Sequence, residues 1–126
     1  APPRSTLFPY TPLFRSSGAY RRLFEADLNR PPLDAADGQY GAATCVGVFS
    51  FGHVMPDAID DICRVLRPGG YLVIGLNDHF YEEGRFPAKL AALEDAHTIE
   101  PVSREHGLHL ANVEGSTGWV FVHRKV

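Results

Sequence analysis

Residues 64–74, RVLRPGGYLVI, decide the fold of this chain. The stretch has the pattern of a helix end, a Pro-Gly-Gly reversal and a buried strand. Pro68 cannot continue a helix, and Gly69 and Gly70 allow backbone angles that residues with a Cβ disfavour. The apolar run that follows predicts a strand over residues 71–77. A helix therefore leads directly into a strand that is buried in a sheet.

The residues before this stretch predict two more strands and one helix. Residues 42–49, AATCVGVF, form a continuous apolar run, which indicates a strand buried on both faces, as in a parallel sheet. Residues 56–66 begin with a proline, and their apolar side chains recur with helical spacing. Residues 23–28, LFEADL, alternate between apolar and polar side chains and predict a short strand.

The residues after it complete an α/β pattern. Residues 78–86 are predicted to form a loop and residues 87–97 an amphipathic helix. Residues 108–115 and 119–126 are predicted to form the two strands of a hairpin, joined by a Gly/Ser turn. Alternating strands and helices predict a mainly parallel sheet, closed by an antiparallel hairpin at the C-terminal end.

Length, charge and cysteine content narrow the functional classes. A chain of 126 residues is predicted to hold one domain at most. A net charge of −3 without a Lys/Arg cluster argues against a nucleic-acid groove. No apolar run approaches the roughly 18 residues of a membrane span, and the N-terminus lacks the pattern of a signal peptide. Cys45 and Cys63 are predicted to be reduced, buried thiols of a cytoplasmic protein.

The ordered set of motifs resembles the class I S-adenosylmethionine-dependent methyltransferases. RVLRPGG before an apolar strand resembles the approach to their fifth strand. YRRLFEADLNRP resembles the third strand, YGAATCVGVFSFGHV the fourth strand and its loop, and GWVFVHRKV the last strand. The closest resemblance, over residues 17–126, is to the methyltransferase-like group named for the Williams–Beuren syndrome region.

The resemblance implies a fold, a cofactor and an activity. The fold would be part of a Rossmann-like sheet with the strand order 3-2-1-4-5-7-6. The cofactor would be S-adenosylmethionine, and the activity would be methyl transfer to a small-molecule or protein acceptor.

The resemblance also implies four cofactor-binding positions. Asp27 is similar to the acidic residue that accepts a hydrogen bond from the adenine amino group, and Leu28 to the residue that meets the adenine ring. Gly47 and Val48 are similar to the end of the fourth strand, where the backbone approaches the methionine part of the cofactor. As alternatives, Asp27 is an ordinary turn residue and Gly47 serves tight packing.

Acceptor-binding residues are expected after the strands, because ligands of open α/β sheets bind beyond the carboxyl ends of the strands. His53 follows one such end and is a candidate general base, or else an ordinary loop histidine. Asn77, Asp78 and Tyr81 follow another and are candidates to position an acceptor. No metal site is expected, since His106 and His109 lack further ligands at metal-binding spacing.

The chain also departs from the family, whose first strand is followed by a Gly-rich turn and whose second strand ends in a ribose-binding acidic residue. No GxG occurs before Asp27. Residues 2–16 instead match the translation of a common short-read sequencing adapter, with Pro12 in place of Thr. We therefore expect residues 1–16 to be a disordered, artefactual prefix, and residues 17–126 to be the C-terminal part of a methyltransferase domain that is inactive by itself.

Two other functional classes stay open. One is a non-catalytic α/β remnant that forms a homodimer, or binds a partner, through an exposed strand edge. The other is a nicotinamide-dependent enzyme on a related sheet, against which the closing hairpin argues.

Overall fold

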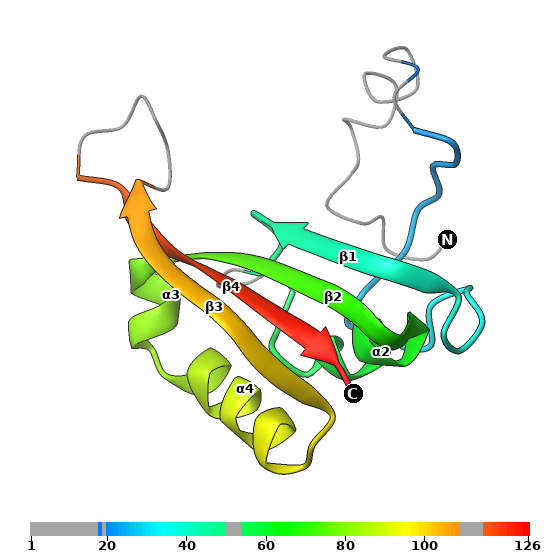
Figure 1. Ribbon diagram of the computed structural model, residues 1–126. Helices are drawn as coiled ribbons and strands as arrows, with labels where there is room; N and C mark the ends of the chain where they lie inside the picture. The colour runs from blue at the N-terminus through cyan, green and yellow to red at the C-terminus, as the bar shows by residue number, and fades with distance from the viewer. Residues whose placement is uncertain (1–17, 19, 50–53, 109–114) are drawn as a thin grey trace.

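The computed structural model describes residues 18, 20–49, 54–108 and 115–126. Its elements occur in the order β1 (Tyr40–Val46), α2 (Ala58–Val65), β2 (Leu66–Asn77), α3 (Asp78–Glu82), α4 (Arg85–Asp95), β3 (Ile99–Leu108) and β4 (Thr117–Lys125). In this part of the chain the strands form one four-stranded sheet with the order β1-β2-β4-β3 (Figure 1). β1 is parallel to β2, and β4 is antiparallel to both β2 and β3. The predicted α/β fold class, with its C-terminal antiparallel hairpin, is confirmed.

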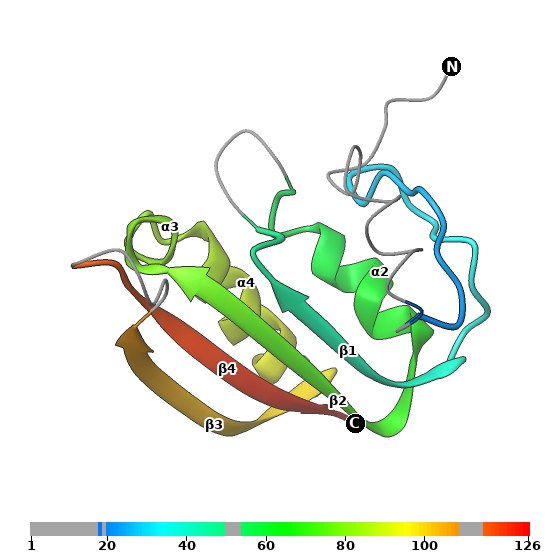
Figure 2. The same ribbon diagram turned by 90° about the horizontal axis from the view of Figure 1, so that it is seen from above.

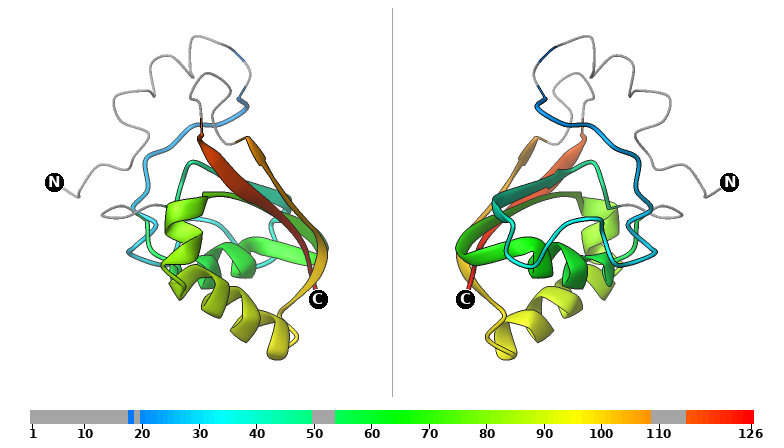
Figure 3. Two further views of the ribbon diagram at one scale, coloured as in Figure 1. Left: turned by 90° about the vertical axis from the view of Figure 1, so that its left-hand side faces the viewer. Right: turned by 90° about the vertical axis from the view of Figure 1, so that its right-hand side faces the viewer.

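The helices cover one face of the sheet. α2, α3 and α4 all lie on the same side in two perpendicular views (Figures 2 and 3). Alternate residues of β2, namely Leu72, Ile74 and Leu76, face these helices and are at most 1% exposed. Tyr71, which points the other way, is 47% exposed. The described residues therefore leave most of the opposite face uncovered, and the core lies between the sheet and the helices.

The Pro-Gly-Gly segment has a different role from the predicted one. α2 ends at Val65 and β2 already begins at Leu66, so the helix passes straight into the strand. Leu66 pairs with Tyr40, but the next pairing along β2 is Tyr71 with Ala42. Residues 67–70 are therefore extra residues on the β2 side, and they form a bulge within the strand rather than a separate turn.

Two strand predictions are wrong, because each segment lacks the neighbours that the pattern assumed. Residues 23–28 form no strand, since no described strand lies beside them to complete a ladder. β1 is not buried on both faces, since it is an edge strand of the described sheet and its outer face is uncovered. Within β1 only Cys45 is buried, whereas Val46 is 68% exposed.

The C-terminal half differs from the expected boundaries. Part of the predicted loop, residues 78–82, is the short helix α3, because the side chain of Asn77 caps it. The first hairpin strand is β3, at Ile99–Leu108, and residues 109–114 lie outside the described residues. β3 is polar and contains Pro101, which an edge strand tolerates but which hides the strand from sequence patterns. The predicted helices at 56–66 and 87–97 are confirmed as α2 and α4, with shifted ends.

Both cysteines are free and buried, as predicted. Burial raises the pKa of both the Cys45 and the Cys63 thiol to about 11, so both stay protonated at neutral pH. No described helix is long and apolar enough to cross a membrane.

An ion pair fastens the segment before β1 to α2. Asp61 is 8% exposed, and its carboxylate accepts hydrogen bonds from the Leu33 N–H and the Arg64 guanidinium, both at 2.6 Å. Arg64 also donates to the carboxylate of Asp37 at 2.7 Å. Burial alone would raise the pKa of Asp61, but the hydrogen bonds from Arg64 and Leu33 and the charge of Arg64 outweigh it, so the pKa lies below its usual value of 3.8.

Asp61→Asn should lower the urea midpoint of unfolding at pH 7, because the lost carboxylate holds two segments together. A lowered pKa in the folded state means that the ionised group stabilises the fold above pH 3.8, and that this contribution disappears as the pH falls through the folded pKa. The difference between wild type and variant should therefore shrink on acidification below about pH 4. Asp95→Asn, at an exposed position of α4, is the matched control, and a pH-independent difference at Asp61 would contradict the interpretation.

Candidate functional site

The carboxyl ends of the parallel strands form the edge where the sequence places a ligand. Val46, the last residue of β1, pairs with Gly75, so β1 and β2 end close together. Gly47 follows the first of these ends and Asp78 follows the second. Residues from both groups of predicted site residues are therefore at one edge of the sheet.

On the β1 side, the backbone is open at Gly47. Its φ is +70°, and no atom lies within 4 Å of the place that a Cβ would occupy. This conformation favours glycine and leaves room for a ligand to approach the backbone. Val48 and Leu28 are partly buried and pack against the same hydrophobic core. Three of the four residues predicted to bind the cofactor thus have apolar or open surroundings.

Asp27 has a clear structural role. Its Oδ1 accepts a hydrogen bond from the Asn29 N–H at 3.0 Å, and Arg30 lies 3.5 Å from Oδ2. The Asn29 side chain in turn accepts a hydrogen bond from the Met55 N–H at 3.1 Å, which ties this turn to the segment before α2. Asp27 therefore stabilises a turn, although no strand precedes it, and its adenine-binding role stays a prediction.

On the β2 side, the predicted acceptor residues fall into different environments. The Asn77 side chain accepts a hydrogen bond from the Phe80 N–H at 2.7 Å and so is engaged as the cap of α3. The Tyr81 ring lies against Trp119, with a centroid distance of 5.2 Å. His53 lies outside the described residues.

Asp78 joins three elements at this edge. The Asp78 Oδ1 lies 2.8 Å from Nε2 of His106 in β3, and the Thr117 hydroxyl of β4 donates to Oδ2. The His106 ring packs on Trp119 at 4.7 Å. A carboxylate that holds one nitrogen of an imidazole orients the other nitrogen, which is an arrangement suited to accepting a proton.

Sequence reasoning missed His106 and Thr117. The predicted hairpin placed its first strand at residues 108–115, whereas the observed register pairs His106 with Trp119 and Leu108 with Thr117. Only that register brings His106 next to Asp78, 28 residues earlier in the chain. Within the described residues, no group of three or more His, Cys, Asp and Glu side chains could hold a metal ion.

The described residues fit part of S-adenosylmethionine. The open backbone at Gly47 and the apolar side chains of Leu28 and Val48 suit the adenine and methionine parts. The Asp27 carboxylate accepts a hydrogen bond from the Asn29 N–H within its own turn, and its remaining lone pairs could accept the adenine amino group without loss of that contact. Among the described residues that precede β1, no Gly-rich turn follows a strand and no strand ends in an acidic residue that could bind the ribose hydroxyls.

Comparison with known proteins agrees with this fold. Residues 13–74, slightly less than half of the chain, match the model of the family described as "Methyltransferase domain". No match to a curated protein was found. Two solved structures are similar: the [4+2]-cyclase SpnF, with a TM-score of 0.62 and 16% identity, and an S-adenosylmethionine-dependent methyltransferase from Methanosarcina mazei, with a TM-score of 0.53 and 15% identity.

The chain covers only part of these structures. The SpnF match includes 90% of this chain and 61% of that chain, and the Methanosarcina match includes 75% and 63%. The observed order β1-β2-β4-β3 corresponds to strands 4-5-7-6 of the expected order. The described fold is thus shared with these two structures, and the match to the methyltransferase family model covers the part of the chain up to residue 74, inside β2.

Proposed function

We propose that this chain belongs to the catalytic domain of a class I methyltransferase, which transfers a methyl group from S-adenosylmethionine to a small-molecule or protein acceptor. One observation carries the proposal: the strand order β1-β2-β4-β3 occurs together with a methyltransferase family match that ends inside β2. A shared fold alone does not fix chemistry, and one similar structure is that of a [4+2]-cyclase. The family match supports the methyltransferase interpretation over that alternative.

The chain's own residues would bind and orient the reactants. S-adenosylmethionine, when bound, supplies a methyl group that is already activated as part of a sulfonium. Gly47, Leu28 and Val48 would contact the cofactor, and Asp78 and Tyr81 would line the acceptor side. His106, oriented by Asp78 at 2.8 Å, is suited to take the proton of an acceptor O–H or N–H. Alignment of the reactants would contribute several kcal/mol to lowering the barrier.

We also propose that this chain by itself binds S-adenosylmethionine poorly. Gly47, Leu28 and Val48 would meet the adenine and methionine parts of the cofactor, and no residue of the described chain is proposed to meet the ribose hydroxyls or the methionine carboxylate and amino groups. Hydrogen bonds to charged groups each contribute roughly 1.5–3 kcal/mol, so their absence costs several orders of magnitude in affinity.

Isothermal titration of S-adenosylmethionine into this chain should give no saturable binding in the micromolar range, and the Methanosarcina mazei methyltransferase serves as the positive control. Micromolar binding by this chain would contradict the proposal of poor binding and would strengthen the methyltransferase assignment. In that case Gly47→Val, which adds a side chain where a ligand would approach, should abolish the heat of binding.

The alternative function is self-association through the edge of β1. β1 is the outer strand of the described sheet, and the side chains of Tyr40 and Val46 on it are exposed. An exposed apolar edge strand is a template for pairing with another chain. Light scattering separates the two functions: an obligate dimer favours this alternative, and a monomer favours the catalytic-domain assignment, which does not require this chain to bind the cofactor by itself.

A further inference from the structure

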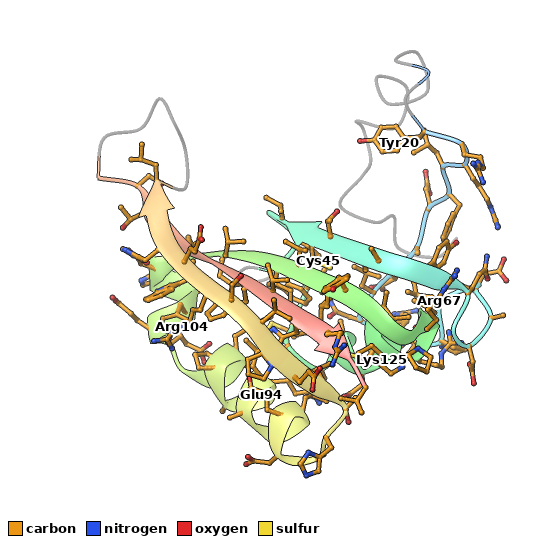
Figure 4. The ribbon with its side chains drawn as sticks, in the orientation of Figure 1. Tyr20, Cys45, Arg67, Glu94, Arg104 and Lys125 are labelled. Carbon is orange, nitrogen blue, oxygen red and sulfur yellow. The ribbon has the colours of Figure 1, made fainter. Side chains whose placement is uncertain are left out.

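A hollow of about 440 Å³ lies between α4 and the β3–β4 hairpin, on the helix-covered face of the sheet. This volume is within the range of roughly 300–1,000 Å³ that small-molecule sites occupy. Figure 4 shows Glu94 of α4 and Arg104 of β3 on this side, and Cys45 and Arg67 on the part of the sheet nearer β1. The hollow extends from Tyr81 to His123, which pairs with Leu72 well before the carboxyl end of β2. Most of the hollow therefore lies away from the edge that carries Gly47 and Asp78, and Tyr81, in the same short helix as Asp78, borders both.

Aromatic and aliphatic side chains form one wall of this hollow. The rings of Tyr81 and Phe121 are stacked, with centroids 5.7 Å apart and an interplanar angle of 26°. Leu90 and Ala91 of α4 line the same space. A planar ring of a ligand would find stacking partners and apolar contacts here.

The other wall is polar and incompletely hydrogen-bonded. Nε2 of His123 lies 2.8 Å from Oε1 of Glu94, and the His123 side chain is only 2% exposed. Nδ1 of His123 is buried without a hydrogen-bond partner among the described residues. Unsatisfied buried polar atoms are rare in native proteins and are characteristic of a place where a ligand or an ordered water belongs.

The positions of the two charged side chains that line the hollow, Glu94 and Arg104, favour a cationic ligand. Glu94 and Arg104 both line it, but they form no ion pair with each other in the described chain. Arg104 instead lies over the Trp119 ring at 5.0 Å, at the opposite end from the Glu94–His123 pair. The carboxylate of Glu94 is thus available to an N–H donor, and a cationic donor would gain a charge-assisted hydrogen bond.

We propose that this hollow binds a small aromatic amine, whose ring stacks on Tyr81 and Phe121 and whose ammonium group donates to Glu94. The site shares Tyr81 with the proposed acceptor side but shares no residue with the proposed cofactor contacts. Binding of the amine can therefore be tested without S-adenosylmethionine and apart from the proposed methyl transfer.

Titration of the full chain with 2-phenylethylamine, followed by ¹H–¹⁵N NMR, tests the proposal. The expected result is saturable shifts of the Tyr81, Phe121 and Trp119 amides. 3-Phenylpropionate, which has a carboxylate in place of the ammonium group, and butylamine, which lacks the ring, should each bind at least several-fold more weakly. No saturable shift, or tighter binding of the carboxylate probe, would overturn the proposal.

Matched variants locate the contacts. Glu94→Gln keeps a hydrogen bond to His123 but removes the charge, and it should weaken 2-phenylethylamine binding about tenfold. Glu105→Gln, at an exposed position of β3, should leave the binding unchanged. Ala91→Leu fills the hollow and should abolish binding, whereas Ala92→Leu, exposed on α4 outside the hollow, should not. Unchanged binding in both Glu94→Gln and Ala91→Leu would refute the site. If either variant fails to fold, the comparison of the three probes on the wild-type chain decides.

Discussion

Leu72→Ala should lower the free energy of unfolding by about 3 kcal/mol, within the range of roughly 2–5 kcal/mol for such core truncations. Leu72 is 0% exposed and is in β2, which is paired on both sides, with β1 and with β4. Its side chain packs in the core between the sheet and the helices. Truncation removes apolar contacts and leaves a cavity that the surrounding strands cannot close, since their hydrogen bonds fix the backbone. Urea unfolding followed by circular dichroism measures the change.

Leu108→Ala is the matched control for this substitution. Leu108 is the last residue of β3 and is 76% exposed, so its truncation should change the unfolding free energy by less than about 0.5 kcal/mol. Equal effects at the two positions would show that β2 is not the centre of the described core. If Leu72→Ala does not fold, Leu72→Met, which keeps most of the volume, should restore cooperative unfolding.

Where an apolar pattern marked an element, the prediction from sequence succeeded. The stripe of Ile59, Ile62, Cys63 and Leu66 identified α2, and all four side chains are at most 5% exposed. The run at residues 71–77 identified most of β2. In both elements the buried positions must be apolar, so the spacing of the apolar residues along the sequence reveals whether the element is a helix or a strand.

Where an element depends on neighbours or on polar contacts, the prediction failed. Residues 23–28 have the alternation of a strand but lack a partner beside them, and alternation does not reveal whether a partner exists. β3 has only Ile99 buried, so its strand character comes from pairing with β4 and not from its composition. α3 depends on one hydrogen bond from the Phe80 N–H to the Asn77 side chain. Such contacts depend on which residues lie close together in the folded chain, and the order of apolar and polar residues along the sequence does not reveal this.

The candidate site, too, was predicted only where a sequence pattern marks its residues. Asp78 and Tyr81 were predicted as acceptor-site residues because residues after the carboxyl end of a strand are expected to face a ligand. Their partners His106 and Trp119 were not found, because the contact depends on the register of a hairpin whose first strand was misplaced. The Glu94–His123 pair has no sequence signal either, since its members are 29 residues apart, on a helix and a strand.

Gly70→Ala tests the bulge that residues 67–70 form in β2. A Cβ at Gly70 would lie 2.8 Å from the carbonyl oxygen of Gly41 and 2.9 Å from that of Arg67, and both are backbone atoms that cannot rotate away. The chain would have to shift the pairing of β1 with β2, at a cost of about 1–3 kcal/mol. This cost outweighs the gain of roughly 0.4–1 kcal/mol that Gly→Ala brings by restricting the unfolded chain.

Gly107→Ala separates the steric cost from the general effect of replacing a strand glycine. Gly107 is in β3, and a Cβ there would meet nothing within 4 Å. Without the clash, the remaining effect is that alanine restricts the unfolded chain more than glycine does. This variant should therefore be neutral or more stable by up to about 1 kcal/mol. Opposite signs at the two positions, measured from urea midpoints, are the expected result. A stabilised Gly70→Ala protein would mean that β1 does not approach the bulge as closely as 2.8 Å, and that Pro-Gly-Gly acts as a free turn.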